Sequence, residues 1–296
     1  MNTATLPLAK KAPSLLIPAL LACYLVWGST YLAIRFALVS FPPFFQMGSR
    51  FLVAGALLMA GVRWRGGAWP NLAQWRNALA VGTLMLGGGM GLTAAATVHI
   101  GSGLVATFIA VVPMMVCAWG LLFGQRPSRL ELLGMAVGLA GVVLLVRGAS
   151  FSAAPVGIAC ITGATLAWSL GSVLSTTRLP LASGPAGFAS EMLCGGAMLM
   201  LIALVLGEQP AWPPTALALG AWAYLVVFGS LVAFSAYLYL LAHASPAVAT
   251  SYAFVNPLIA LFLGVVFASE AVSGGEWVAC GVILTGVLLI FRGKTA

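Results

Sequence analysis

Residues 50–59 read RFLVAGALLM, and residues 191–200, 141 positions farther on, read EMLCGGAMLM. Trp27 and Trp168 are separated by the same 141 positions. Later in each half the offset grows by a few residues, as small insertions would cause, and the matches continue in order: His99 with His243, Pro113 with Pro257, Glu131 with Glu276, and Arg147 with Arg292. One such match is uninformative, but an ordered series along both halves indicates an internal repeat.

The composition restricts the class of protein. Of 296 residues, 62% are hydrophobic and only 6% are charged, whereas a soluble domain carries about 25% charged residues. The 13 basic and five acidic side chains cannot cover a water-facing surface of this size. A disordered chain is excluded because such chains are poor in large apolar residues. The sequence therefore predicts an integral membrane protein.

A transmembrane helix needs about 20 apolar residues, and the apolar runs of this chain predict ten such helices. The connections between them are short and leave no room for a soluble domain. A β-barrel is excluded because the apolar runs are continuous and do not alternate. The predicted spans are residues 14–37, 43–62, 76–97, 101–123, 130–147, 155–177, 185–207, 216–241, 245–268 and 275–292.

Each repeat contains five predicted helices. Five is an odd number, so the second copy must enter the membrane from the opposite side, and the repeats are inverted. We divide the chain into an N-terminal tail (1–13), a first repeat (14–148) and a second repeat (149–293). Inverted repeats are typical of transporters, because two similar halves of opposite orientation can exchange outward-open and inward-open states.

The positive charge predicts the orientation. With the N-terminus inside, ten Lys and Arg residues fall on the inner side, and the outer side receives only Arg147 and Arg35. This bias places both termini in the cytoplasm. The net charge of +8 therefore reflects topology, and no nucleic-acid partner is implied. The first span resembles a lipoprotein signal up to Cys23, but its apolar run is too long, so we expect it to remain uncleaved.

The sequence offers few residues for enzyme catalysis, metal binding or ATP-driven transport. It contains no Asp, five Glu and two His, which are the residues that acid–base catalysis and metal binding use. The five Cys stand singly in apolar runs, without a CxxC pair. No ATP-binding motif is present, so a transporter would be driven by a gradient. We predict no enzyme activity, no metal and no cofactor.

Three motifs carry a family resemblance. They are Trp27-Gly28-Ser29-Thr30-Tyr31, then Pro42-Pro43 followed by Arg50-Phe51, and Ser251-Tyr252-Ala253-Phe254-Val255-Asn256-Pro257 followed by Glu270. Together with the two five-helix units, they resemble the drug/metabolite transporter superfamily, specifically its EamA-type ten-helix exporters, over about residues 15–293. The resemblance implies a central cavity between two four-helix sets, with the fifth and tenth helices peripheral. It also implies export of amino acids, including aromatic ones, or of other small metabolites from a bacterial cytoplasm across the inner membrane.

Polar and aromatic side chains predict the walls of a site. Trp27 and Tyr31 share a face of the first helix, Trp168 and Ser172 share a face of the sixth, and Tyr252 and Asn256 share a face of the ninth. Trp27 and Trp168 stand near the midplane, away from the interfaces where Trp is common. Pro113 and Pro257 predict matching helix breaks in the two halves. The alternative interpretation is that the hydroxyls join helices and the prolines are packing kinks.

Arg50 and Glu191 are ionisable residues inside predicted spans, where charge is costly and function is the default hypothesis. Because their helices enter from opposite sides, we expect them at different depths and not as a direct ion pair. Arg50 could attract a substrate carboxylate, and Glu191 could carry a proton. Alternatively, each could bond a nearby helix end and serve structure alone. A single deep Arg argues against phosphate-bearing substrates.

The sequence thus favours a secondary exporter of small organic solutes, most of all aromatic or large neutral amino acids, working by alternating access. An exporter or exchanger of other metabolites or drugs, and a channel-like facilitator, remain alternatives. The expected partners are the solute and the lipid bilayer. A second copy could bind through the peripheral helices, where Gly134 and Gly138 lie one turn apart.

Overall fold

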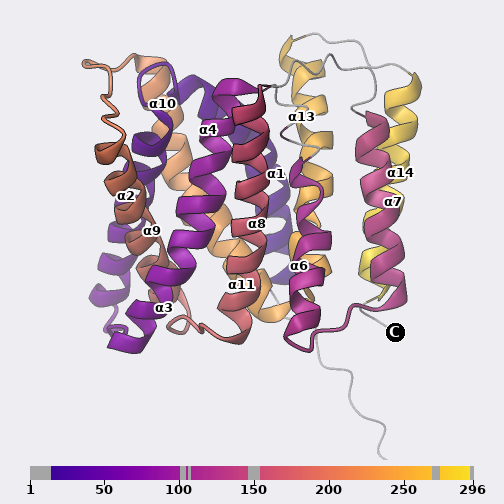
Figure 1. Cartoon of the computed structure of the whole chain (residues 1–296), viewed down its shortest axis with the longest axis horizontal. Coiled ribbons are helices and arrows are strands. Elements are labelled where there is room, and N and C mark those ends of the chain that lie inside the picture. Colours follow the sequence, from indigo (N-terminus) through magenta and orange to yellow (C-terminus); the bar gives the residue numbers. More distant parts are fainter. Residues whose placement is uncertain (1–14, 101–104, 106–107, 146–153, 269–273, 294–296) are drawn as a thin grey trace, which may run out of the picture.

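The computed structural model of the chain describes residues 15–100, 105, 108–145, 154–268 and 274–293. Within these ranges the chain forms helices and no strand, and the helices lie side by side across the molecule (Figure 1). The first repeat contains α1 (Leu16–Ala37), α2 (Pro43–Trp64), the continuous series α3 (Leu72–Gly82), η1 (Thr83–Gly91) and α4 (Leu92–His99), then α6 (Val112–Leu122) and α7 (Arg129–Leu145).

The second repeat follows the same order. It contains α8 (Pro155–Thr177), α9 (Pro185–Val205), the continuous series α10 (Ala216–Tyr224), η2 (Leu225–Phe234) and α11 (Ser235–His243), then α12 (Pro246–Thr250), α13 (Tyr252–Ala268) and α14 (Gly274–Gly293). Described helices fall in each of the ten predicted spans. The predicted all-α membrane fold is confirmed.

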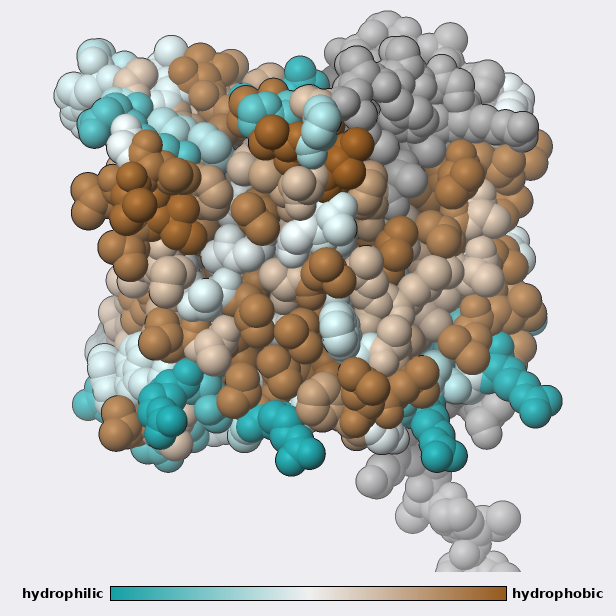
Figure 2. Space-filling view, viewed as in Figure 1, coloured by the Kyte–Doolittle hydropathy of each residue, from teal (hydrophilic) through white to brown (hydrophobic). Residues whose placement is uncertain are grey.

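The surface of the molecule suits a lipid environment. Figure 2 shows apolar side chains across the middle of one face and hydrophilic side chains along its lower rim. Among the described residues, six helices are long and apolar enough to cross a membrane: Leu16–Ala37, Pro43–Trp64, Leu72–His99, Pro155–Thr177, Pro185–Val205 and Ala216–His243. Val112–Leu122 and Trp277–Gly293 are shorter apolar helices. A continuous helix of about 20 apolar residues spans the hydrocarbon core.

Apart from Arg35, which is exposed in the last turn of α1 at the opposite end, the exposed arginines mark one end of the helix bundle. They stand where helices end or begin at that side: Arg63, Arg65, Arg76, Arg126, Arg129, Arg178 and Arg292. We call this end the inner face, because Lys and Arg gather on the cytoplasmic side of membrane proteins. Helix α1 begins at the inner face and α14 ends there (Figure 1). Arg147, the predicted outer residue, lies outside the described residues.

The packing of α2 against α9 shows how the repeats are related. A Cβ added to Gly55 would lie 3.0 Å from the backbone nitrogen of Leu193. A Cβ added to Gly196, the repeat mate of Gly55, would lie 2.9 Å from the backbone nitrogen of Leu52, the repeat mate of Leu193. The same contact therefore occurs twice, between antiparallel helices. The two repeats are inverted and related by an approximate two-fold axis.

Helices α7 and α14 form a second antiparallel pair at the edge of the molecule (Figure 1). A Cβ on Gly286 would lie 2.5 Å from the backbone nitrogen of Gly138 and 2.7 Å from the carbonyl oxygen of Gly134. The small residues thus let two helices of one chain approach closely. This face of α7 is already covered by α14, so it cannot serve the pairing with a second copy that Gly134 and Gly138 suggested.

The helix interruptions lie before the two prolines. In the ninth span the chain breaks at Ser251, between α12 and α13, and α13 continues through Pro257. The expected break at Pro257 is therefore displaced, because a proline removes one hydrogen bond and the packing of α13 against α1 maintains the helix. In the fourth span, α6 begins at Val112, and Pro113 occupies its first turn, where its missing N–H leaves no bond unmade.

Candidate functional site

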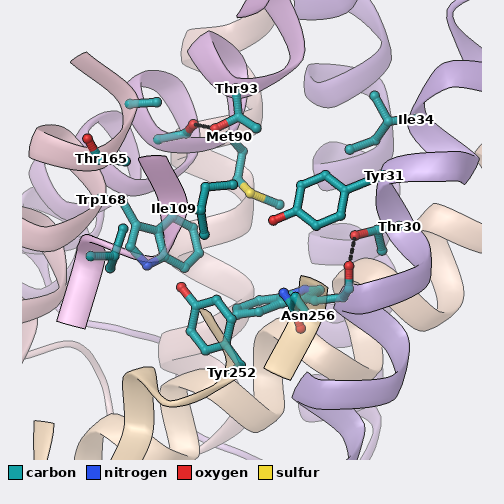
Figure 3. Close-up of a pocket in the computed structure, with 14 residues that line it drawn as sticks. Thr30, Tyr31, Ile34, Met90, Thr93, Ile109, Thr165, Trp168, Tyr252 and Asn256 are labelled. Carbon is teal, nitrogen blue, oxygen red and sulfur yellow. Dashed lines mark hydrogen bonds between the residues drawn. The ribbon is translucent and has the colours of Figure 1, made fainter. Parts of the chain in front are cut away.

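A cavity of about 60 Å³ lies between the repeats, from mid-depth toward the face opposite the arginines. Helices α1 and α8 form two of its walls, and the η1–α4 segment, the start of α6 and α13 complete it (Figure 3). We call it the axial cavity. Its lining residues are Trp27, Thr30, Tyr31, Ile34, Gly89, Met90, Thr93, Ile109, Val112, Ala164, Thr165, Trp168, Tyr252 and Asn256.

Four rings close the inner end of the axial cavity, and we call them the aromatic cluster: Trp27, Trp168, Tyr237 and Tyr252. The repeat mates Trp27 and Trp168 meet edge to face at 5.6 Å between ring centroids. Tyr252 approaches Trp27 to 4.6 Å, and Tyr237 stacks on Trp168 at 5.2 Å. Each such contact contributes stability in addition to that from burying apolar surface. The four rings therefore form a closed layer between the inner and outer faces of the molecule.

Glycine in η1 makes room for one of these rings. A Cβ on Gly89 would lie 2.8 Å from the Trp168 ring, and a Cβ on Gly88 would lie 2.6 Å from Ala167. The π-helical segments η1 and η2 occupy corresponding positions in the two repeats, and long π segments are rare and often mark functional sites. The glycine-rich stretch therefore lets α8 pack closely against η1, which places the Trp168 ring near the axis.

The polar groups around the axial cavity include three atoms without a partner among the described residues. They are Nε1 of Trp168 and both amide atoms, Oδ1 and Nδ2, of Asn256. Both side chains are buried, and a buried polar group without a hydrogen bond is costly unless a ligand or water satisfies it. The Tyr31 hydroxyl lies near the Asn256 amide, and the Tyr237 and Tyr252 hydroxyls lie near the ring nitrogen of Trp168, so a bound molecule would share these polar groups with the tyrosines.

Three threonine hydroxyls add acceptor capacity. Thr30 donates to the Trp27 carbonyl (2.7 Å), Thr93 donates to the Gly89 carbonyl (2.7 Å), and Thr165 donates to the Thr162 carbonyl (2.9 Å). Each hydroxyl oxygen retains lone pairs for a ligand. No charged side chain lines the cavity among the described residues. Such a lining suits a neutral or zwitterionic molecule with an apolar body.

Five of the six predicted substrate-binding residues meet at this cavity: Trp27, Tyr31, Trp168, Tyr252 and Asn256. Ser172 does not line it. Its hydroxyl lies behind Trp168, where it donates to the Trp168 carbonyl at 2.7 Å and shares a 2.9 Å hydrogen bond with the Tyr237 hydroxyl.

Sequence reasoning missed the contribution of the third helix. Met90 and Thr93 line the cavity, and Tyr237, the repeat mate of Thr93, joins the aromatic cluster. The signal was available in the offset of 144 between Thr93 and Tyr237, which equals that between His99 and His243. Neither Thr93 nor Tyr237 belongs to a polar stripe as clear as that of the first helix, so the spacing of polar residues does not identify them.

The structure brings neither Arg50 nor Glu191 into the axial cavity. Both are fully buried, and none of their charged-group atoms has a hydrogen-bond partner among the described residues. The guanidinium of Arg50 lies 4.5 Å from the centre of the Phe51 ring. The side chains do not bond helix ends, as the structural interpretation required, and they do not pair with each other. Among the described residues, both are buried charged side chains without a hydrogen-bonding or ion-pair partner.

Two inverted five-helix repeats, with an uncharged cavity on the axis between them, define the architecture of a transporter. The chain belongs to the EamA-like transporter family, which matches residues 14–147 and 155–292.

Relatives agree with this assignment. A protein of Escherichia coli (strain K12) named as the uncharacterized inner membrane transporter YedA is 41% identical over 280 residues, covering 94% of this chain and 91% of that protein. Protein PecM of Dickeya dadantii (strain 3937) is 25% identical, covering 90% of this chain and 88% of that protein. A solved crystal structure shares the fold with a TM-score of 0.78 and 22% identity, over 96% of this chain and 99% of that chain. The chain is a multi-pass inner-membrane protein of a transporter family.

Proposed function

We propose that the protein exports neutral or zwitterionic amino acids with aromatic or large apolar side chains by alternating access. The observation that supports this is the pairing of an aromatic wall, Trp27 and Trp168, with the unpartnered amide of Asn256. The rings would bind the apolar side chain, and the amide would bind the polar backbone of the solute. A solute of net charge would need a charged partner, which the cavity lining lacks.

The cavity must widen to bind such a solute. Its volume of about 60 Å³ is far below the roughly 300–1,000 Å³ of typical ligand pockets. Widening requires the aromatic cluster to open, because Trp27, Trp168 and Tyr252 occupy the axis. Binding and conformational change are therefore one event in this proposal, as alternating access requires.

Counterflow in proteoliposomes tests the proposal. Purified protein is reconstituted into vesicles loaded with an unlabelled amino acid, and uptake of the same labelled amino acid is followed. We expect transient accumulation of labelled phenylalanine, tryptophan or leucine, which saturates with concentration, and no accumulation of glutamate or lysine. Flux that does not saturate would favour a channel-like facilitator. Equal transport of charged amino acids would contradict the neutral-solute assignment.

A further inference from the structure

A second hollow opens at the inner face and has no role in the site described so far. It has a volume of about 920 Å³ and lies between the start of α1, the end of α8, the start of α9 and the helix α11. We call it the inner hollow. Its volume falls near the upper end of the range for pockets that bind small molecules, about 300–1,000 Å³.

The lining of the inner hollow resembles that of the axial cavity in chemistry. It is mainly apolar, with the hydroxyls of Ser175, Thr176 and Ser235 and the imidazole of His243 among its polar groups, and no Asp, Glu, Lys or Arg lines it among the described residues. The hydroxyl oxygen of Ser235 is buried and has no hydrogen-bond partner there. A buried hydroxyl without a partner is available to a polar group of a bound solute.

The inner hollow and the axial cavity share two helices. Helix α1 supplies Ala22 to the hollow and Trp27 to the cavity, five residues apart, which is about 7.5 Å along a helix. Helix α8 supplies Ser175 to the hollow, and Ser175 is the repeat mate of Ile34 in the cavity. The aromatic cluster lies between the two spaces. One pair of equivalent helix positions, Ile34 and Ser175, therefore lines a space on each side of the aromatic cluster.

We infer that the inner hollow is a second solute-binding site, which takes neutral molecules with an apolar body from the cytoplasmic side before they pass the aromatic cluster. This inference rests on the proposed function for the direction of movement. The cytoplasmic side would thus have a binding site of its own for the same class of solute. Ser235 would bind a polar group of the solute, and the walls of α1 and α11 would cover its apolar part.

Thiol labelling tests the inner hollow directly. In a variant whose native cysteines are replaced, Thr176→Cys, at an exposed position in the lining of the hollow, should react with a membrane-impermeant thiol reagent in inverted vesicles, where the inner face is exposed. L-Phenylalanine at ten times its apparent dissociation constant should slow the reaction about tenfold. Arg65→Cys, exposed at the inner face and outside the lining of the hollow, is the matched control, and phenylalanine should not change its reaction rate.

A filling variant provides an independent test. Ala22→Trp should block the hollow and abolish phenylalanine uptake into inverted vesicles, whereas Leu21→Trp should transport like the parent. An unreactive thiol at position 176, or one that no transported amino acid protects, overturns the inference while the proposed function stands. If the parent transports none of the amino acids, the proposed function fails, and protection is then measured with the neutral fluorophore N-phenyl-1-naphthylamine. Protection by that probe supports the hollow as a site for neutral solutes, and its absence overturns it.

Discussion

At the scale of single residues, Trp168 combines the two properties of the proposed site, a ring on the axis and an unpartnered donor atom. Trp168→Ala removes ring contacts that each contribute about 0.5–1.5 kcal/mol, so binding of aromatic amino acids should weaken about three- to tenfold. Equilibrium binding to the purified protein measures this. Trp212→Ala is the control, because Trp212 is exposed in a loop. Unchanged transport in both Trp168→Ala and Trp27→Ala would show that these rings serve packing alone.

Glu191 supports a second prediction at this scale. Its carboxylate is buried without a partner among the described residues, and protonation would remove the cost of the charge. If Glu191 carries the coupling proton, Glu191→Gln should abolish uptake driven by a proton gradient and leave exchange between equal pools intact. Both activities are measured in the same proteoliposomes. A parallel fall in both, together with less folded protein in the membrane, would indicate a structural role.

At the scale of helices, the glycine contacts between α7 and α14 predict a specific sensitivity. Gly286→Leu places a side chain against the backbone of Gly138, and such overpacking costs about 1–3 kcal/mol. We expect a lower melting temperature in detergent. Gly281→Leu is the matched control on the same helix, because a Cβ there meets nothing within 4 Å. Equal melting temperatures for the two variants would contradict the close packing of α7 and α14.

Much of the helix arrangement could be predicted from the sequence, because apolar length and the repeat offset are properties of the chain alone. The ten spans, the inversion and five residues of the cavity follow from them. Ser172 was misplaced because helical spacing identifies a face of the helix but not what lies at each depth along it. The π segments and the break at Ser251 depend on how neighbouring helices pack against them. The local sequence of α12 and α13 does not specify that packing.

At the scale of the whole molecule, inversion predicts the orientation of repeat mates. Arg147 and Arg292 should lie on opposite sides of the membrane, since five helices separate corresponding positions. In the cysteine-free background, Arg147→Cys and Arg292→Cys should therefore be labelled by an impermeant reagent from opposite sides. Intact cells and inverted vesicles provide the two sides. Labelling of both positions from the same side would rule out inverted repeats.

The repeat mates around the axis are not identical, and this difference has an energetic consequence. Tyr31 faces the axial cavity, whereas its mate Ser172 bonds Tyr237. With two identical halves, the two-fold axis would relate the outward-facing form to the inward-facing form. The two forms would then have equal free energy, and the protein without solute would populate them equally. Because the repeat mates differ, the two forms differ in free energy. A free-energy difference of about 1.4 kcal/mol already gives a tenfold preference for one form. A few side chains at the axis thus determine whether the protein without solute is mainly outward-facing or inward-facing. Exchanging Tyr31 and Ser172 should shift this preference.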